Sequence, residues 1–175
     1  MIQTFSNYDR HELIEAGIDV GDNVRISKSV VFYNPQNITI GNNVRIDYGC
    51  LLIAGKDTKL IIKDNTHINA YCSFHANTGD IIIGKEVDIA IYTVLFTATF
   101  DYSIKKPRTN TTVGSIVIED NVIVGPSCII LPNSVLGESC SVGANSFIKN
   151  NVDRETIVAG NPCKLIKNKS HIKDR

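Results

Sequence analysis

A six-residue repeat in the second half of the chain constrains the fold more than any other feature. Five copies follow one another over residues 118–147, each beginning with an aliphatic residue and placing a small residue at its fifth position. A repeat of this length cannot be the period of one strand or one helix, so it marks a supersecondary unit that stacks on copies of itself. Three short strands joined by tight turns make one triangular coil, whose first and fifth hexad positions point inward. The sequence therefore predicts an all-β fold, a parallel β-helix.

The repeat extends through most of the chain with one interruption. Coils begin where an aliphatic residue precedes Gly or another turn-compatible residue, at Val20, Ile40, Ile62, Ile83, Ile118 and Leu136. These starts predict about six coils. The interval from Ile83 to Ile118 is 35 residues, whereas three hexads need 18. We therefore expect one loop to protrude at about residues 100–115.

Both ends of the chain lie outside the repeat, and we predict a single domain over residues 1–175. Residues 8–17 are typical of a short helix that ends at Gly17. Residues 1–19 should cap the first coil, whose open end would otherwise expose strand edges. The β-helix is expected over residues 20–153. Residues 154–175 are expected to form a tail, because Gly160 and Pro162 break the period there.

Composition narrows the classes of partner. The chain has 18 Lys and Arg against 18 Asp and Glu, so its formal net charge is zero and gives no electrostatic reason to expect nucleic acid or an anionic membrane. No apolar run approaches the ~20 residues that a membrane span needs, and residues 1–21 lack the apolar core of a signal peptide. We expect a cytoplasmic protein without a membrane span.

The cysteines follow the repeat. Four of the five stand at the fifth position of a hexad, namely Cys50, Cys72, Cys128 and Cys140. A small buried thiol behaves as a small apolar side chain, so we interpret these four as core residues. Cys163, in the tail, is also expected to be structural, and no C-x-x-C spacing suggests a metal or redox site.

The C-terminal part of the chain carries a family resemblance. Residues 118–167, which end in Ala-Gly-Asn-Pro-Cys-Lys-Leu-Ile-Lys, resemble hexapeptide-repeat acyltransferases of the galactoside/maltose acetyltransferase type, including those of surface-polysaccharide clusters. The resemblance covers nearly the whole chain. It implies a left-handed β-helix, a homotrimer with active sites between neighbouring subunits, and acetyl-coenzyme A or another acyl-coenzyme A as co-substrate.

By position, the resemblance also implies a set of coenzyme contacts. These are Gly125, Pro126, Ser127, Gly143 and Ala144, with Lys149, Lys164 and Lys167 near the phosphates. Small residues stacked one coil apart would let an extended pantetheine arm lie against the backbone, and Lys ammonium groups would meet phosphate oxygens. The glycines have an alternative explanation in turn geometry alone. Pro126 has no N–H, so a contact there has to come from Ser127 or from a carbonyl.

The chain departs from the family where the protruding loop begins. The resembling enzymes have a Thr-Ala-Thr-His run whose His is the general base toward a sugar hydroxyl, but here Thr97-Ala98-Thr99 is followed by Phe100. A positioned base contributes roughly 10²- to 10⁴-fold, so hydroxyl acylation without it would be slow. An amine is already nucleophilic in its neutral form. Relatives without that His, which have Thr-Asp-Asp or a similar run there, include N-acyltransferases of nucleotide-linked amino sugars, and Asp101 matches their second acid.

Four polar residues remain as candidates for chemistry. Asn69 aligns with the substrate-binding Asn of the family, with a turn role as the alternative. His67 lies in a His-Ile-Asn-Ala-Tyr run that resembles one in the His-lacking relatives, and is otherwise a surface residue. His75 is one coil from the loop base and could supply a displaced imidazole. Asp101 could orient an ammonium or accept its proton, or be a solvated loop acid.

Three functional hypotheses follow. The preferred one is transfer of an acetyl or other acyl group to the amine of a nucleotide-linked amino sugar for a surface polysaccharide. The alternatives are a sugar O-acetyltransferase that uses a displaced His, and a non-catalytic trimeric scaffold. A zinc enzyme on this fold would need three His from adjacent coils, including a His-x₄-His pair, and the four His of this chain lack that spacing. We therefore expect no metal.

Overall fold

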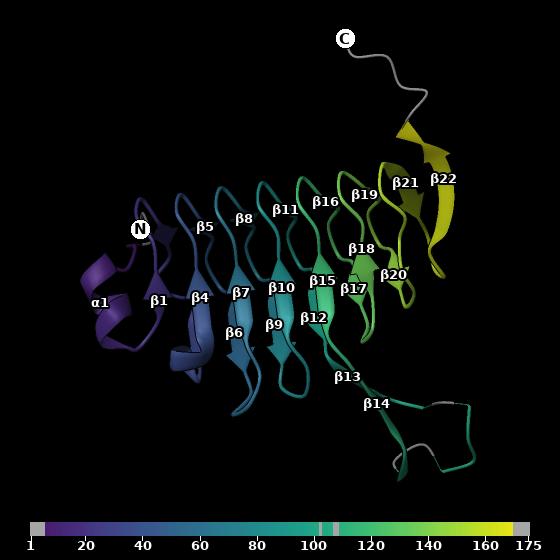
Figure 1. Cartoon of the computed structure of the whole chain (residues 1–175), viewed down its shortest axis with the longest axis horizontal. Helices are drawn as coiled ribbons and strands as arrows, with labels where there is room; N and C mark the ends of the chain where they lie inside the picture. The colour runs from purple at the N-terminus through teal and green to yellow at the C-terminus, as the bar shows by residue number, and fades with distance from the viewer. Residues whose placement is uncertain (1–5, 102, 107–108, 170–175) are drawn as a thin grey trace, which may run out of the picture.

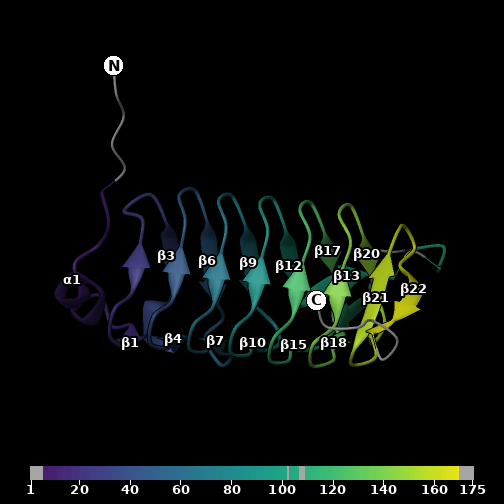
Figure 2. The same ribbon diagram turned by 90° about the horizontal axis from the view of Figure 1, so that it is seen from above.

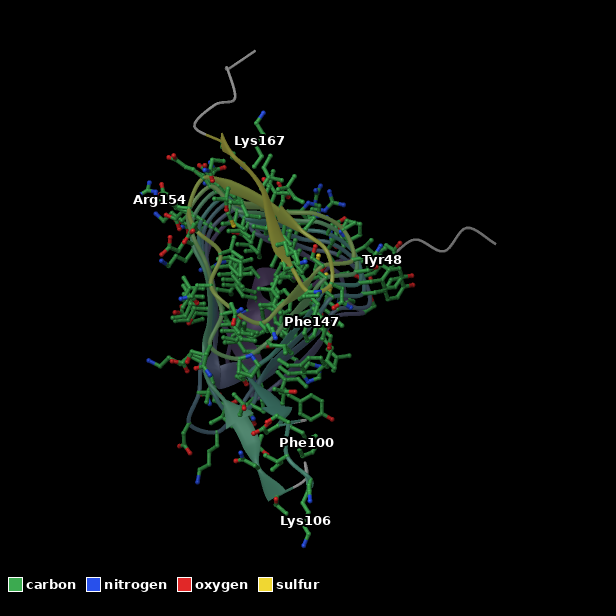
Figure 3. The ribbon with its side chains drawn as sticks, turned by 90° about the vertical axis from the view of Figure 1, so that its right-hand side faces the viewer. Tyr48, Phe100, Lys106, Phe147, Arg154 and Lys167 are labelled. Carbon is green, nitrogen blue, oxygen red and sulfur yellow. The ribbon has the colours of Figure 1, made fainter. Side chains whose placement is uncertain are left out.

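The computed structural model describes residues 6–101, 103–106 and 109–169 and confirms a parallel β-helix of six complete coils. The coils stand in a row (Figures 1 and 2), and each complete coil adds one strand to each of three parallel sheets that form the sides of a prism (Figure 3). The first sheet consists of β1 (Asp19–Val20), β4 (Ile38–Ile40), β7 (Leu60–Ile62), β10 (Ile81–Ile83), β15 (Ile116–Ile118) and β18 (Val135–Leu136). The third consists of β3 (Val31–Tyr33), β6 (Leu51–Ala54), β9 (Ser73–Ala76), β12 (Val94–Phe96), β17 (Ile129–Ile130) and β20 (Phe147–Ile148).

The second sheet has eight strands because two are added after the last complete coil. Its strands are β2 (Arg25–Ile26), β5 (Arg45–Ile46), β8 (His67–Ile68), β11 (Asp88–Ile89), β16 (Ile123–Val124), β19 (Ser141–Val142), β21 (Thr156–Ala159) and β22 (Lys164–Asn168). β21 pairs parallel with β19, and β22 turns back antiparallel to β21. The expectation that the chain leaves the repeat at residue 153 is therefore corrected. The sheet continues, and β22 covers the edge that β21 would otherwise leave open.

The interior follows the hexad rule. The six expected coil starts lie in register one above another, as the pairs Val20↔Ile40, Ile40↔Ile62, Ile62↔Ile83, Ile83↔Ile118 and Ile118↔Leu136. All six are at most 5% exposed. The four hexad cysteines are buried and all five cysteines are free, as the sequence predicted for a core without disulfides.

The N-terminal helix α1 (Arg10–Glu15) covers the first coil, as predicted. Asp9 and Glu12 form a reciprocal capping box at its start, which satisfies backbone donors that the helix cannot pair internally. Leu13 is 1% exposed and belongs to the same core cluster as the coil residues. No helix among the described residues is long and apolar enough to cross a membrane.

The predicted protruding loop is a β-hairpin. β13 (Ala98–Phe100) and β14 (Thr111–Val113) pair antiparallel, and the hairpin leaves the prism at the corner between the third and first sheets (Figures 1 and 3). Thr97 and Gly114 close its base through a hydrogen bond from the Gly114 N–H to the Thr97 carbonyl, 3.0 Å long. Because the chain returns to the prism there, β15 still pairs with β10 in register.

Candidate active site

A column of small residues runs along the edge of the second sheet, at the carboxyl ends of its strands. We call Ala90, Gly125, Gly143 and Ala159 the small-residue column. Successive members come from successive coils. The N–H group of each of the first three donates to a carbonyl of the coil that follows it, at 2.8 Å. Asn69 precedes Ala90 in the same line. Its N–H donates to the Ile89 carbonyl of the following coil, just as the Ala90 N–H donates to the Val124 carbonyl. A straight track about four coil spacings long therefore runs from Asn69 to Ala159.

Coil stacking by itself explains both glycines. A Cβ on Gly125 would lie 2.7 Å from the Ala144 nitrogen, and one on Gly143 would lie 2.8 Å from the Ala159 Cβ. Either atom would force neighbouring coils apart. Close coil packing is therefore sufficient to explain both glycines, and their contact with coenzyme A stays a prediction.

Among the residues that the structure describes, the Ala144 N–H is a free donor at the corner beside the column. The Ala144 N–H, next to the position that a Gly125 Cβ would fill, makes no hydrogen bond within the described part of the chain. The Ser127 N–H, in contrast, donates to the Ile91 carbonyl at 2.9 Å, so only its hydroxyl can meet a ligand. Ser127 and Ala144 are both exposed. An amide carbonyl of an extended ligand could accept from Ala144 at this place.

The lysines lie at the far end of the column. Lys164 pairs with Ala159 across β21 and β22, so it follows directly on the last small residue. Lys149 and Lys164 both line a cavity of about 180 Å³ at this end of the prism. Lys167 lies farther along β22, opposite Ile157 (Figure 3). All three side chains are exposed, so ammonium groups are available to an anion here.

At the other end of the column, His67 lies between two carboxylates. Its Nε2 is 3.0 Å from Asp47 Oδ2, and its Nδ1 is 3.5 Å from Asp88 Oδ1. Arg45 Nε donates to Asp47 Oδ1 at 2.7 Å. Burial raises the pKa of Asp47, but hydrogen bonds from His67 and Arg45 outweigh it and hold that pKa below its usual range. Asp47 is therefore ionised at neutral pH and orients the imidazole.

Asn69 is half-buried one residue beyond the end of β8. Its backbone is fully used, since its N–H donates to Ile89 and its carbonyl accepts from the Cys50 thiol at 3.1 Å. Its side-chain amide, however, has no hydrogen-bond partner among the described residues. The amide is thus free to bind a polar ligand group.

His75 lies on a different side of the prism, on the outer face of the third sheet. Its ring stacks on Phe96 with 4.9 Å between centroids, and its Nε2 is 2.8 Å from Ser73 Oγ. Burial lowers the pKa of His75, so the neutral imidazole is favoured. His75 lies beside the base of the hairpin, since Thr97 donates to its carbonyl through both N–H and Oγ1.

Asp101 is held by its own hairpin. Its Oδ1 accepts from the Ser103 N–H at 2.9 Å and from Ser103 Oγ at 2.5 Å, and its Oδ2 accepts from Asn110 at 3.3 Å. The Ser103 bonds lower the pKa of Asp101. Phe100, which stands where the family's base is expected, instead lines an apolar cavity of about 290 Å³ with Phe96, Ala98, Thr99 and Thr111.

Comparison with known proteins identifies the family of this chain. The family model described as bacterial transferase hexapeptide (six repeats) matches residues 115–150. A dTDP-4-amino-4,6-dideoxy-D-glucose acyltransferase of Escherichia coli is 34% identical over 171 residues, which cover 93% of this chain and 88% of that protein. The chain belongs to the hexapeptide-repeat acyltransferases.

Solved structures of this acyltransferase family include close matches. AntD, an N-acyltransferase from Bacillus cereus solved with dTDP-4-amino-4,6-dideoxyglucose and coenzyme A, is 35% identical, has a TM-score of 0.87 and matches over 95% of this chain and 92% of its own. Galactoside acetyltransferase in complex with coenzyme A shares the fold, at 23% identity and a TM-score of 0.58 over 91% of this chain and 70% of its own.

Within this acyltransferase the candidates form two groups. His67 and Asn69 lie together at the start of the small-residue column, whereas His75 and Asp101 lie on the third sheet and the hairpin, separated from them by a corner of the prism. Asp47 was not among the residues predicted from the sequence. A signal was present, because Arg45-Ile46-Asp47 occupies the coil place that His67-Ile68-Asn69 takes in the next coil.

Proposed function

We propose that this acyltransferase transfers an acyl group, most simply acetyl, from coenzyme A to the amine of a nucleotide-linked amino sugar used in surface-polysaccharide synthesis. The observation that carries the proposal is the single track from Asn69 to Lys164. The position of the usual histidine base is filled by Phe100. Relatives named for a dTDP-amino sugar, one of them solved with that sugar and coenzyme A, support an amine acceptor.

The chemistry asks little of the protein beyond positioning. The neutral amine attacks the thioester carbonyl carbon, a C–N bond forms, and the C–S bond breaks with the electron pair going to sulfur. The excess proton leaves the ammonium and ends on the thiolate. We assign His67 as its first acceptor, oriented by Asp47, and Asn69 as the group that holds the sugar beside the thioester. An amine needs this base less than a hydroxyl does.

The test is thiol release from acetyl-coenzyme A in the presence of paired acceptors. We expect turnover with dTDP-linked amino sugars and none with the hydroxyl sugars of the same stereochemistry. Turnover of hydroxyl sugars alone would instead favour an O-acetyltransferase that uses a displaced His, such as the neutral His75. If coenzyme A at millimolar concentration fails to raise the melting temperature, the chain is a scaffold rather than an enzyme.

We propose further that the active unit is a homotrimer in the cytoplasm. The outer face of the third sheet is mostly apolar apart from Ser73 and His75, and Val31, Tyr33 and Ile129 on it are 50%, 60% and 40% exposed. Covering this face with a second copy would remove apolar surface from water. It would also let the hairpin of one subunit approach the small-residue column of another.

Subunit complementation tests the shared site. A chain with His67→Gln and a chain whose residues 98–113 are replaced by Asn-Gly should each have reduced activity, because one lacks the base and the other the hairpin. Mixed trimers formed by co-expression should regain activity, since some clefts then combine two intact halves. Activity of mixtures no higher than that of the separate variants, with trimers present by sedimentation, would refute the shared site.

A further inference from the structure

Three tyrosines form an exposed cluster at the corner between the second and third sheets. The rings of Tyr71 and Tyr92, from successive coils, are parallel within 7° with 5.3 Å between centroids, and Tyr48 meets Tyr71 edge-on at 5.2 Å. Tyr71 and Tyr92 are 45% and 55% exposed. Tyr48 marks this corner in Figure 3. Large rings that remain in water without joining the core call for an explanation from function.

The backbone makes tyrosine a costly choice at this corner. Tyr71 and Tyr92 have φ angles of 57° and 63°, in the left-handed region that Gly and Asn tolerate best. The equivalent corner places in other coils are held by Gly49, Ser127 and Asn145. Fold geometry therefore favours small or Asn side chains at both places, and the aromatic rings are a departure from it.

The stack is closed at one end and open at the other. The Tyr71 ring packs over Gly49. Only glycine leaves room for this ring, because a Cβ on Gly49 would lie 2.4 Å from a ring carbon of Tyr71. Beyond Tyr92, the next coil offers Ser127, which has no ring to continue the stack. One face of Tyr92 is thus directed toward a small residue, beside the small-residue column and within a coil of Asn69.

We propose that Tyr92, supported by Tyr71, is a stacking platform for the nucleobase of the acceptor nucleotide. The inference rests on the proposed function for the identity of the acceptor. An aromatic face binds any base by stacking and needs no charge, which agrees with the neutral composition of the chain. AntD, which this chain resembles, was solved with dTDP, so a nucleoside diphosphate binds to that protein.

The adenine of coenzyme A is the other possible source of a base, and the lysines argue against it. Lys149 and Lys164, expected at the phosphates of the coenzyme, lie at the Ala159 end of the column, three coils and about 15 Å from Tyr92. An extended coenzyme with its phosphates there directs the adenine away from the tyrosines. The base at Tyr92 is then that of the acceptor.

The experiment compares Tyr92→Asn with Tyr92→Phe. Asn already occupies this corner at Asn145 with a φ of 56°, so the first variant removes the ring without straining the backbone, and the second keeps the ring. Titration of dTDP should show a dissociation constant raised about tenfold or more for Y92N and changed less than about twofold for Y92F. Coenzyme A and adenosine 3′,5′-bisphosphate should bind both variants as they bind the wild type.

Each other outcome overturns the platform. Unchanged dTDP affinity in Y92N removes it, and so does failure of the wild type to bind dTDP. Weaker binding of adenosine 3′,5′-bisphosphate alone would assign the ring to the coenzyme, and a changed sedimentation coefficient with normal dTDP binding would make the tyrosines a subunit contact. The proposed function fails separately, through absence of acyl transfer, because dTDP binding is measured without turnover.

Discussion

The small-residue column and the hairpin both flank the candidate site, yet they are held in different ways. Each member of the column is fixed by backbone hydrogen bonds to neighbouring coils, so its place is set by the whole β-helix. The two strands of the hairpin pair with each other, Asn133 of the next coil donates to the Val113 carbonyl, and Asp101 is held by local bonds to Ser103. The placement of the column therefore depends on the whole β-helix, whereas the shape of the hairpin depends on a few local bonds.

The largest expected effect concerns chemistry at the start of the column. His67→Gln should lower kcat/KM for the amino sugar about 100-fold, the lower part of the range for a general base, because a neutral amine is already nucleophilic. Steady-state kinetics with both substrates measures it, and the affinity for coenzyme A should not change. His11→Gln on helix α1 is the matched control. Equal activity of both variants would remove His67 from the chemistry.

Excision of the hairpin should have a somewhat smaller effect on activity and almost none on stability. Replacing residues 98–113 by Asn-Gly keeps the Thr97 to Gly114 closure and every coil pair. We expect kcat/KM to fall at least about tenfold through loss of positioning. The melting temperature should stay within a few degrees of the wild type. A large loss of stability would mean that the coils depend on the hairpin and are not held by their own hydrogen bonds alone.

The register of the coils could be predicted from the sequence, whereas the hairpin could be predicted only in part. Ile83 and Ile118 fixed the coil register although 35 residues separate them, because inward aliphatic residues must stack. The hairpin appeared only as an excess of length. Its pairing and the bonds of Asp101 arise from local geometry that carries no repeat.

In the candidate site, too, some residues could be predicted from the repeat and the family resemblance and others could not. The column from Gly125 to Lys164 was expected from the family resemblance, and its stacking follows from the repeat. The contact of His67 with Asp47 needs the lateral register of two coils, which no single motif contains. Strand β21 was missed because Asp153 and Gly160 obscure the last hexad.

At the far end of the column, Lys164→Ala should weaken coenzyme A binding about tenfold, the typical worth of one charge-assisted contact to a phosphate. Titration calorimetry measures it. Raising the salt concentration should reduce the difference, because the side chain is exposed. Lys56→Ala, an exposed lysine far from the column, is the control. Equal affinity of K164A and K56A would place the phosphates elsewhere.

On the hairpin, Asp101→Asn and Ser103→Ala should lower kcat/KM by a similar factor, roughly two- to fivefold. Both remove a bond that shapes the turn, and each such bond is worth about 1 kcal/mol. The two values of kcat are the decisive comparison. A loss confined to D101N and much larger than that of S103A would show that the carboxylate takes part in proton transfer.

The smallest expected effect is a pH dependence of stability that arises from His75, on the sheet between the small-residue column and the hairpin. Burial lowers the pKa of His75 in the fold, while the unfolded chain keeps a value of about 6.5. Between these two values the unfolded state binds more protons, so stability rises with pH and is lost as the pH falls below about 6.5. The wild type should therefore lose more melting temperature from pH 7.5 to pH 5 than His75→Gln does. Because the ring is only half-buried, the difference should be small, and parallel curves for the two proteins would mean that stacking on Phe96 leaves the imidazole equally easy to protonate in both states.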